Sequence, residues 1–182
     1  MQRQPTLLSS CARATTAAEA GYRISYAFAH RSSRVIALDE QSAAIVRDMA
    51  GRLWGGGHFL VFDSALPDDD ALLRRVPGQD DPGTGGTALL SEELASADTV
   101  VMVAAAEGSA EAASVIGDAA AAHGIMSAGL VVPGETPAGE TPGGTPGESL
   151  DGIVSALRPN AMVLVVLREA GDLPEVLSAL RV

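Results

Sequence analysis

Hydrophobic positions along the chain form two alternating patterns, and the first consists of short uninterrupted apolar runs. Such runs are typical of strands buried on both faces of a parallel sheet. They predict strands at residues 34–38, 58–62, 99–105, 126–132 and 161–167. A weaker alternation of Ile24, Tyr26 and Phe28 is compatible with a short edge strand within residues 22–29.

The second pattern is hydrophobic spacing of helical period between the apolar runs. Ala44, Ile45, Met49 and Leu53 follow this period in residues 41–54, and the glycines at 55–57 end the helix. Further helices are predicted at residues 88–97, 110–123, 149–157 and 173–180. Strands that alternate with helices indicate the α/β class. We therefore expect a three-layer, Rossmann-like domain with a mostly parallel sheet of about five to six strands.

Polar segments set the expected domain limits. Residues 63–87 contain consecutive aspartates and a Gly-Thr-Gly-Gly run, which predicts a long loop with a short helix near Ala71–Arg75. Residues 133–149 repeat a Gly-Glu-Thr-Pro unit without apolar anchors, which predicts a mobile low-complexity loop. We expect residues 1–33 to form an N-terminal tail, which includes any edge strand, and residues 34–182 to form one domain.

Composition excludes several classes of function. Hydrophobic residues make up 47% of the 182 residues but aromatics only 3%, so the core must be built from Ala, Val, Leu and Ile. The net charge of -11 leaves no basic face for nucleic acid. All 12 basic residues are arginine, which excludes mechanisms that need a lysine.

The single cysteine, Cys11, permits no disulfide within the chain and no cysteine-based metal site. It fits a reducing cytosol. The sequence has neither a signal-peptide pattern nor an apolar run long enough to span a membrane. We therefore expect a cytoplasmic protein.

Five segments, taken in order, resemble the GTPase domain of the tubulin/FtsZ family, which suggests a bacterial protein. They are Arg34–Met49, His58–Ala65, Gly83–Thr87, Glu92–Val132 and Leu150–Leu173. The hydrophobic frame of the family is kept in Glu92–Val132, and the resemblance runs in order over roughly residues 34–175. The resemblance implies the fold of the FtsZ N-terminal domain.

The phosphate-binding loops of that family are altered in this chain. Where the family has four glycines after the first strand, this chain has Asp39, Glu40, Gln41 and Ser42. The second glycine loop is replaced by the shorter Ala106–Glu111. Glycines let a backbone approach a phosphate closely, whereas carboxylates repel it. The sequence also ends at Val182, before the family's central helix and second domain, so the resemblance implies no GTP hydrolysis by the family's route.

Three functions follow as hypotheses. The first is a non-catalytic pseudo-GTPase without a cofactor, which acts through protein–protein association with itself or with an FtsZ-like polymer. The second is a nucleotide-binding module that still takes GTP or GDP, using loop remnants at Gly83, Thr84, Gly85, Gly86, Thr87, Gly108 and Ser109. The third is an unrelated α/β enzyme that uses an acidic crevice. No catalytic residue and no metal ligand is assigned.

The crevice of the third hypothesis rests on four carboxylates. Asp39, Glu40, Glu107 and Glu111 follow two predicted strands, whose carboxyl ends border the ligand crevice of open α/β sheets. They either converge there, with raised pKa values, or lie separately at helix N-termini, where the helix dipole favours them.

Hydroxyl and imidazole groups also have two interpretations. Ser42 and Ser109 are candidate helix N-caps, and Ser109 is a weaker candidate nucleophile. His30, His58 and His123 are well separated in the sequence and do not suggest one site. His123 is placed to donate a hydrogen bond to a carbonyl at a helix C-terminus. Trp54 is expected in the core or at an interface.

Overall fold

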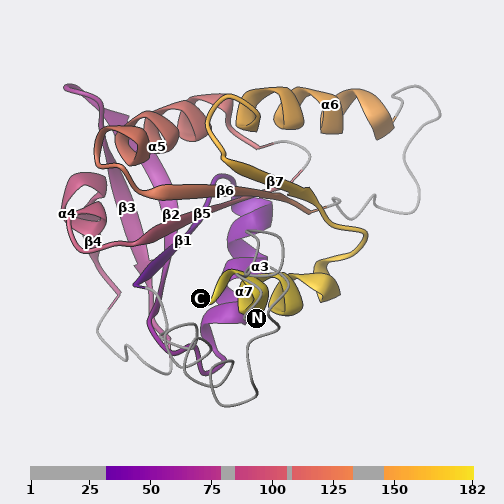
Figure 1. Cartoon of the computed structure of the whole chain (residues 1–182), viewed down its shortest axis with the longest axis horizontal. Coiled ribbons are helices and arrows are strands. Elements are labelled where there is room, and N and C mark those ends of the chain that lie inside the picture. The colour runs from indigo at the N-terminus through magenta and orange to yellow at the C-terminus, as the bar shows by residue number, and fades with distance from the viewer. Residues whose placement is uncertain (1–31, 79–84, 106–107, 133–145) are drawn as a thin grey trace, which may run out of the picture.

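The fold is a seven-stranded sheet flanked by helices on both faces (Figure 1). The computed structural model describes residues 32–78, 85–105, 108–132 and 146–182. In chain order the elements are β1 Ser33–Ala37, α3 Glu40–Ala50, β2 Gly57–Leu66, β3 Asp70–Val76, β4 Thr87–Leu89, α4 Leu90–Leu94, β5 Thr99–Ala104, α5 Ala110–Ala122, β6 Met126–Val131, α6 Pro146–Leu157, β7 Val163–Val166, the 3₁₀ turn η1 Ala170–Asp172 and α7 Leu173–Leu180.

The strand order places a topological switch point in the middle of the sheet. The order is β4-β3-β2-β1-β5-β6-β7. Five of these strands, β2, β1, β5, β6 and β7, run parallel to one another. From β1 the chain first moves outward to β2 and later returns to the other side of β1 as β5. Open α/β sheets bind ligands at the carboxyl ends of the two strands where the order reverses. In this protein those strands are β1 and β5.

Helices cover the two faces of the sheet in separate groups (Figure 1). Helices α4, α5 and α6 pack on one face over a cluster that includes Ile36, Met102 and Ile116. Helices α3 and α7 pack on the other face. Apart from Trp54 and Phe59, the two clusters of fully buried residues contain only aliphatic residues and methionine, as the composition predicts.

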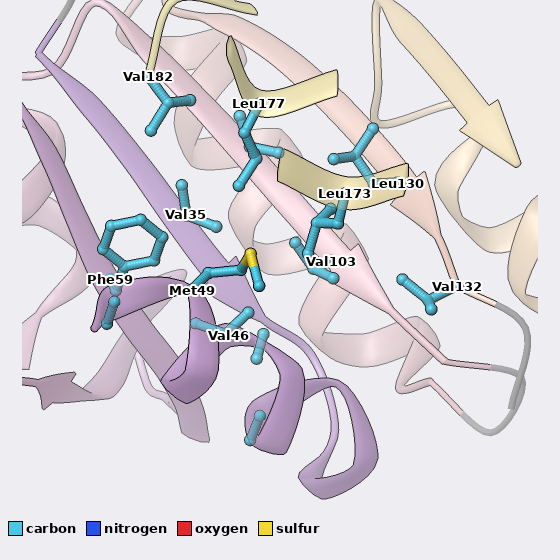
Figure 2. Packing of buried hydrophobic residues seen from close by; sticks show 14 of the residues in the cluster. Val35, Val46, Met49, Phe59, Val103, Leu130, Val132, Leu173, Leu177 and Val182 are labelled. Carbon is cyan, nitrogen blue, oxygen red and sulfur yellow. The ribbon is translucent and has the colours of Figure 1, made fainter. Parts of the chain in front are cut away.

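Helix α7 closes the second face through two leucines. Leu173 and Leu177 are fully buried, and Figure 2 shows them above Val35 and Val103 of the sheet. Burying a leucine side chain stabilises a fold by about 1.5–3 kcal/mol, so these contacts are sufficient to hold a short helix. Val182, which follows the helix, lies over the same cluster close to Phe59.

The main correction to the sequence prediction concerns residues 63–87. The sequence predicts a long loop there, with a short helix near Ala71–Arg75. In the structure β2 continues to Leu66, and residues 70–76 form the antiparallel strand β3. The turn between them has positive φ at Asp68 and Asp69, 70° and 56°, as mirror-image hairpin turns require. The run of aspartates marked a turn between strands, so the sheet has seven strands rather than five or six.

Other boundaries shift by smaller amounts. Helix α3 ends at Ala50 and not near residue 54, so Leu53 lies beyond the helix and is exposed. The helix predicted at 88–97 is shortened to α4, because residues 87–89 form β4 beside β3. Helix α6 starts at Pro146, inside the segment that was predicted as a loop. The predicted tail up to residue 31 and most of the repeat, residues 133–145, lie outside the described residues. Within the described residues, no helix combines the length and the apolarity needed to cross a membrane.

Candidate functional site at the carboxyl end of the sheet

Asp39 occupies the switch point between β1 and β5. One carboxylate oxygen, Oδ1, accepts a hydrogen bond from the backbone N–H of Ser42 at 2.7 Å, in the first turn of α3. The other oxygen, Oδ2, accepts from the N–H of Ala105 at 2.9 Å, directly after β5. A single side chain therefore joins the ends of both strands that border the crevice.

The sequence builds this arrangement as a capping box. Asp39 is the N-cap of α3, and the hydroxyl of Ser42 accepts a hydrogen bond from the N–H of Asp39 at 3.2 Å. Ser42, a candidate N-cap in the sequence, is instead the third residue of the helix, where it completes the box. The buried Ser42 fixes the position of the carboxylate.

This geometry determines what the crevice can bind. In Rossmann-like folds the N–H groups at the helix N-terminus after the first strand hold a phosphate. Asp39 directs its own negative charge at those N–H groups. An incoming phosphate would lose these donors and would be repelled by the carboxylate, at about 1 kcal/mol per close charge pair even in water.

Glu40 points away from this crevice. Its carboxylate pairs with Arg47 at 2.9 Å and Arg74 at 3.3 Å on the exposed surface of α3. The hydrogen bond to Arg47 is the main cause that lowers the pKa of Glu40, with a further contribution from Arg74. For Glu40 the alternative of convergence with a raised pKa therefore fails. Its carboxylate lies separately in the first turn of α3, where arginines are its partners.

Of the other two acidic candidates, only Glu111 belongs to the part of the chain that the structure describes. Glu107 lies outside the described residues. Glu111 is exposed in the first turn of α5, where the helix dipole favours an acidic residue. Within the described ranges, no group of three or more His, Cys, Asp or Glu residues is placed to hold a metal ion.

Gly108 and Ser109 have structural roles at the start of α5. The N–H of Gly108 donates to the carbonyl of Ala105 at 3.0 Å. A Cβ at Gly108 would lie 2.8 Å from Ile153 Cδ1 and 2.9 Å from Ala104 Cβ, so packing alone requires glycine. Ser109 is the N-cap of α5, with its hydroxyl accepting from Ala112 at 3.2 Å. This confirms its interpretation as a cap.

The remaining glycine loop lies elsewhere on the sheet. Gly83 and Thr84 are outside the described residues, while Gly85, Gly86 and Thr87 lead into β4 at the edge of the sheet. Gly86 accepts a hydrogen bond from the N–H of Arg75 at 2.7 Å. Since β4 and β5 are separated by four strand spacings, about 19 Å, the structure does not bring this loop together with Gly108 and Ser109.

Trp54 and two of the three histidines have local structural partners. Trp54 is buried, donates from Nε1 to the carbonyl of Met49 at 2.7 Å and packs against Phe59, which confirms a core position. His123 contacts the carbonyl of Ala119 through Nδ1 at 2.9 Å, as expected at a helix C-terminus. His58 lies 3.4 Å from Glu93, and His30 is outside the described residues.

A groove beside α3 is large enough for a small ligand, but few polar side chains point into it. This groove, between α3 and the η1–α7 segment, has a volume of about 460 Å³ and is lined largely by small or apolar side chains such as Ala44, Ile45 and Pro174. The charged residues on its rim, Asp48 and Arg52, pair with each other at 3.5 Å. The groove therefore does not indicate a catalytic arrangement.

Sequence reasoning missed a buried ionic cluster around Glu93 in α4. Arg34 of β1 is only 2% exposed and donates from Nε to Glu93 Oε2 at 2.8 Å, while Glu93 itself is 4% exposed. Arg75 of β3 binds the other oxygen, Oε1, from Nε at 2.9 Å and from Nη2 at 2.8 Å. A lone arginine at the start of an apolar strand was the available signal, because a buried guanidinium requires a buried carboxylate.

Burial and the arginine partners shift the pKa of Glu93 in opposite directions. Burial alone raises the pKa of Glu93, but the hydrogen bond from Arg75 and the charges of Arg34 and Arg75 outweigh burial, so the pKa is lowered. Asp70, at the other end of α4, shows the same balance. Burial raises its pKa, and hydrogen bonds from Ser91 and Ala71 lower it below the ordinary value.

No protein-family model matches the chain, and no curated protein matches it with significance. The class of protein that the structure defines is an α/β fold with a mostly parallel, Rossmann-like sheet.

Proposed function

We propose that this protein is a non-catalytic member of the Rossmann-like class that acts through association with other protein chains. The observation that carries the proposal is the position of Asp39. Its carboxylate binds the N–H groups of Ser42 and Ala105 at the switch point, where a nucleotide-binding relative would hold phosphate. A fold whose ligand position is filled by its own side chain retains surfaces for association.

The resemblance to the tubulin/FtsZ family supports a more specific version of this proposal, in which the protein is a degenerate FtsZ-like domain in the cytoplasm that associates with itself or with an FtsZ-like polymer. The order of the five parallel strands is compatible with that family's Rossmann-like sheet. The antiparallel β3 and the position of Gly85 and Gly86 give the more specific version no support. The more specific version rests on the residue resemblance alone, because a shared fold does not by itself identify a binding partner.

A thermal-shift titration with GTP, GDP and ATP, with and without Mg²⁺, tests the proposal. A ligand at a hundred times its dissociation constant stabilises the folded state by about 2.7 kcal/mol, which is readily measured as a shift in Tm. We expect no shift for the wild-type protein. A shift of several degrees with GTP would overturn the proposal in favour of a nucleotide-binding module.

Two variants test whether Asp39 is the reason. Asp39→Asn removes the charge but keeps a side chain that caps helices well. If the carboxylate blocks an otherwise competent crevice, this variant gains a nucleotide-dependent shift that the wild type lacks. Glu111→Gln is the matched control, because it neutralises an exposed carboxylate in the first turn of the neighbouring helix and leaves Asp39 in place. If neither variant gains a nucleotide-dependent shift in Tm, the carboxylate of Asp39 is not the only feature that keeps a nucleotide out of the crevice.

A further inference from the structure

Strand β7 leaves an apolar edge uncovered by other described elements. It is the last strand of the sheet, with β6 on one side and no described strand on the other. Met162, Val163 and Val166 are 77%, 41% and 53% exposed. Leu53 is the other large hydrophobic residue that is exposed within the described ranges, and it lies after α3.

Natural proteins normally protect such an edge. Charged residues, proline, bulges or a very short strand prevent pairing with other chains. The opposite edge, β4, follows this rule with three residues before the start of α4. β7 has four residues and is nearly as short, but residues 160–167 contain neither a charged residue nor a proline that would prevent pairing.

We propose that β7 pairs with β7 of a second copy of this chain, antiparallel about a twofold axis, to make one continuous sheet across a dimer. This inference rests on the proposed function and specifies its partner as the chain itself. An antiparallel edge contact is self-complementary, because each strand offers the same backbone N–H and C=O groups to the other.

Charge around the strand favours the antiparallel arrangement. Arg158 precedes β7, whereas Arg168, Glu169 and Asp172 follow it and together carry a net charge of −1. Antiparallel pairing places the positive end of each strand beside the negative end of the other. Since β7 itself is uncharged, symmetric pairing brings no like charges face to face, which matters for a chain with a net charge of -11.

The contact surface sets the expected strength. A stable interface buries about 800 Å² on each partner, and a four-residue strand supplies only part of that area. We therefore expect a reversible dimer whose population depends on protein concentration. Sedimentation equilibrium of the full chain, from micromolar to near-millimolar concentration, measures its dissociation constant.

Lysine substitutions at the edge provide the decisive comparison. Val166→Lys and, at the more exposed position, Met162→Lys should each raise the dissociation constant at least tenfold while Tm stays close to that of the wild type. Leu53→Lys places the same charge on another exposed hydrophobic residue and should leave the dimer unchanged.

Three outcomes would overturn this inference. They are a protein that is monomeric at every concentration, an oligomer that both edge variants leave intact, or edge variants that lower Tm strongly in a monomer, which would mean that the chain covers its own edge. An intact oligomer refutes the β7 contact and leaves the proposed association standing. Nucleotide binding by the wild type refutes the proposed function whatever the state of β7.

Discussion

Two carboxylates at different places in the sheet, Asp39 and Glu93, show two ways in which this fold uses negative charge. Asp39 is half-buried and binds backbone N–H groups at the carboxyl ends of β1 and β5. Glu93 is almost fully buried and binds the guanidinium groups of Arg34 and Arg75. The first carboxylate has no cationic partner among the described residues, and the second has two.

The difference follows from what surrounds each group. At the switch point the partial positive charge of a helix N-terminus is available, and a carboxylate satisfies it in the absence of a ligand. Near the start of β1 the cluster holds the antiparallel extension, because Arg34, Arg75 and Glu93 come from β1, β3 and α4. Asp39 therefore occupies donors at the crevice, whereas Glu93 links α4 to arginines of β1 and β3.

The largest expected effect comes from removing the buried charge. Glu93→Gln should lower the free energy of unfolding by about 3–5 kcal/mol, because Arg34 would keep its charge in a dry environment without a counterion. Only the hydroxyls of Ser32 and Ser96, at 3.0 and 2.8 Å, would remain as its hydrogen-bond acceptors among the described residues. Urea unfolding at pH 7 measures the change. The control is Glu92→Gln, an exposed neighbour that should be close to neutral; equal effects of the two variants would contradict the assigned role of Glu93.

Removing Asp39 should cost less. Asp39→Ala deletes the N-cap of α3 and leaves the buried N–H of Ala105 without its acceptor, so we expect a loss of about 2 kcal/mol. Asp39→Asn keeps one carbonyl oxygen and should recover roughly half of that loss. The same urea series tests this order, and an alanine variant as stable as the wild type would mean that another group satisfies both donors.

The pH dependence sharpens the comparison. The pKa values of Glu93 and Asp70 are lowered in the folded state, so the unfolded chain binds more protons in acid. Their stabilisation is present above the ordinary pKa values, about 4, and is lost as pH falls through the lower folded values. Each unit of lowering corresponds to about 1.4 kcal/mol.

The expected measurement is a set of unfolding curves between neutral pH and strong acid. Wild type and Glu93→Gln should differ most at pH 7 and converge in acid, because protonated Glu93 also leaves Arg34 without a counterion. A gap that stays constant down to strong acid would show that the loss in Glu93→Gln arises from packing and not from charge.

The parallel part of the fold could be predicted from the sequence for a simple physical reason. Strands buried on both faces are uninterrupted apolar runs, so β1, β5 and β6 stand out in residues 33–37, 99–104 and 126–131. Strand β3 does not, because Arg74 and Arg75 are exposed and the turn before it consists of aspartates. Its strand character depends on pairing with β2, which is a tertiary contact.

The candidate site shows the same limit. The place of Asp39 in the sequence, directly after a predicted strand, was enough to put it at the crevice. Its hydrogen bond to Ala105 could not be predicted, because it joins residues 66 positions apart. Glu40 was grouped with Asp39 by adjacency in sequence. The chain turns sharply at the helix start, and Glu40 faces arginines of α3 and β3 instead. Neighbouring residues at a helix N-terminus point in different directions, which spacing alone does not resolve.

The smallest expected effect is that of Glu40. Its ion pairs are exposed, in contrast to the contacts of the two structural carboxylates, Asp39 and Glu93. Its side chain is 71% exposed, so water and salt screen its contacts with Arg47 and Arg74. Although these arginines lower its pKa, we expect Glu40→Gln to leave the unfolding midpoint in urea unchanged within experimental error at physiological salt. Repeating the measurement at low salt should reveal a small loss, because screening is weaker there. A large loss at both salt concentrations would place Glu40 with Glu93 as a structural charge, and the separation drawn between exposed and buried carboxylates in this fold would fail.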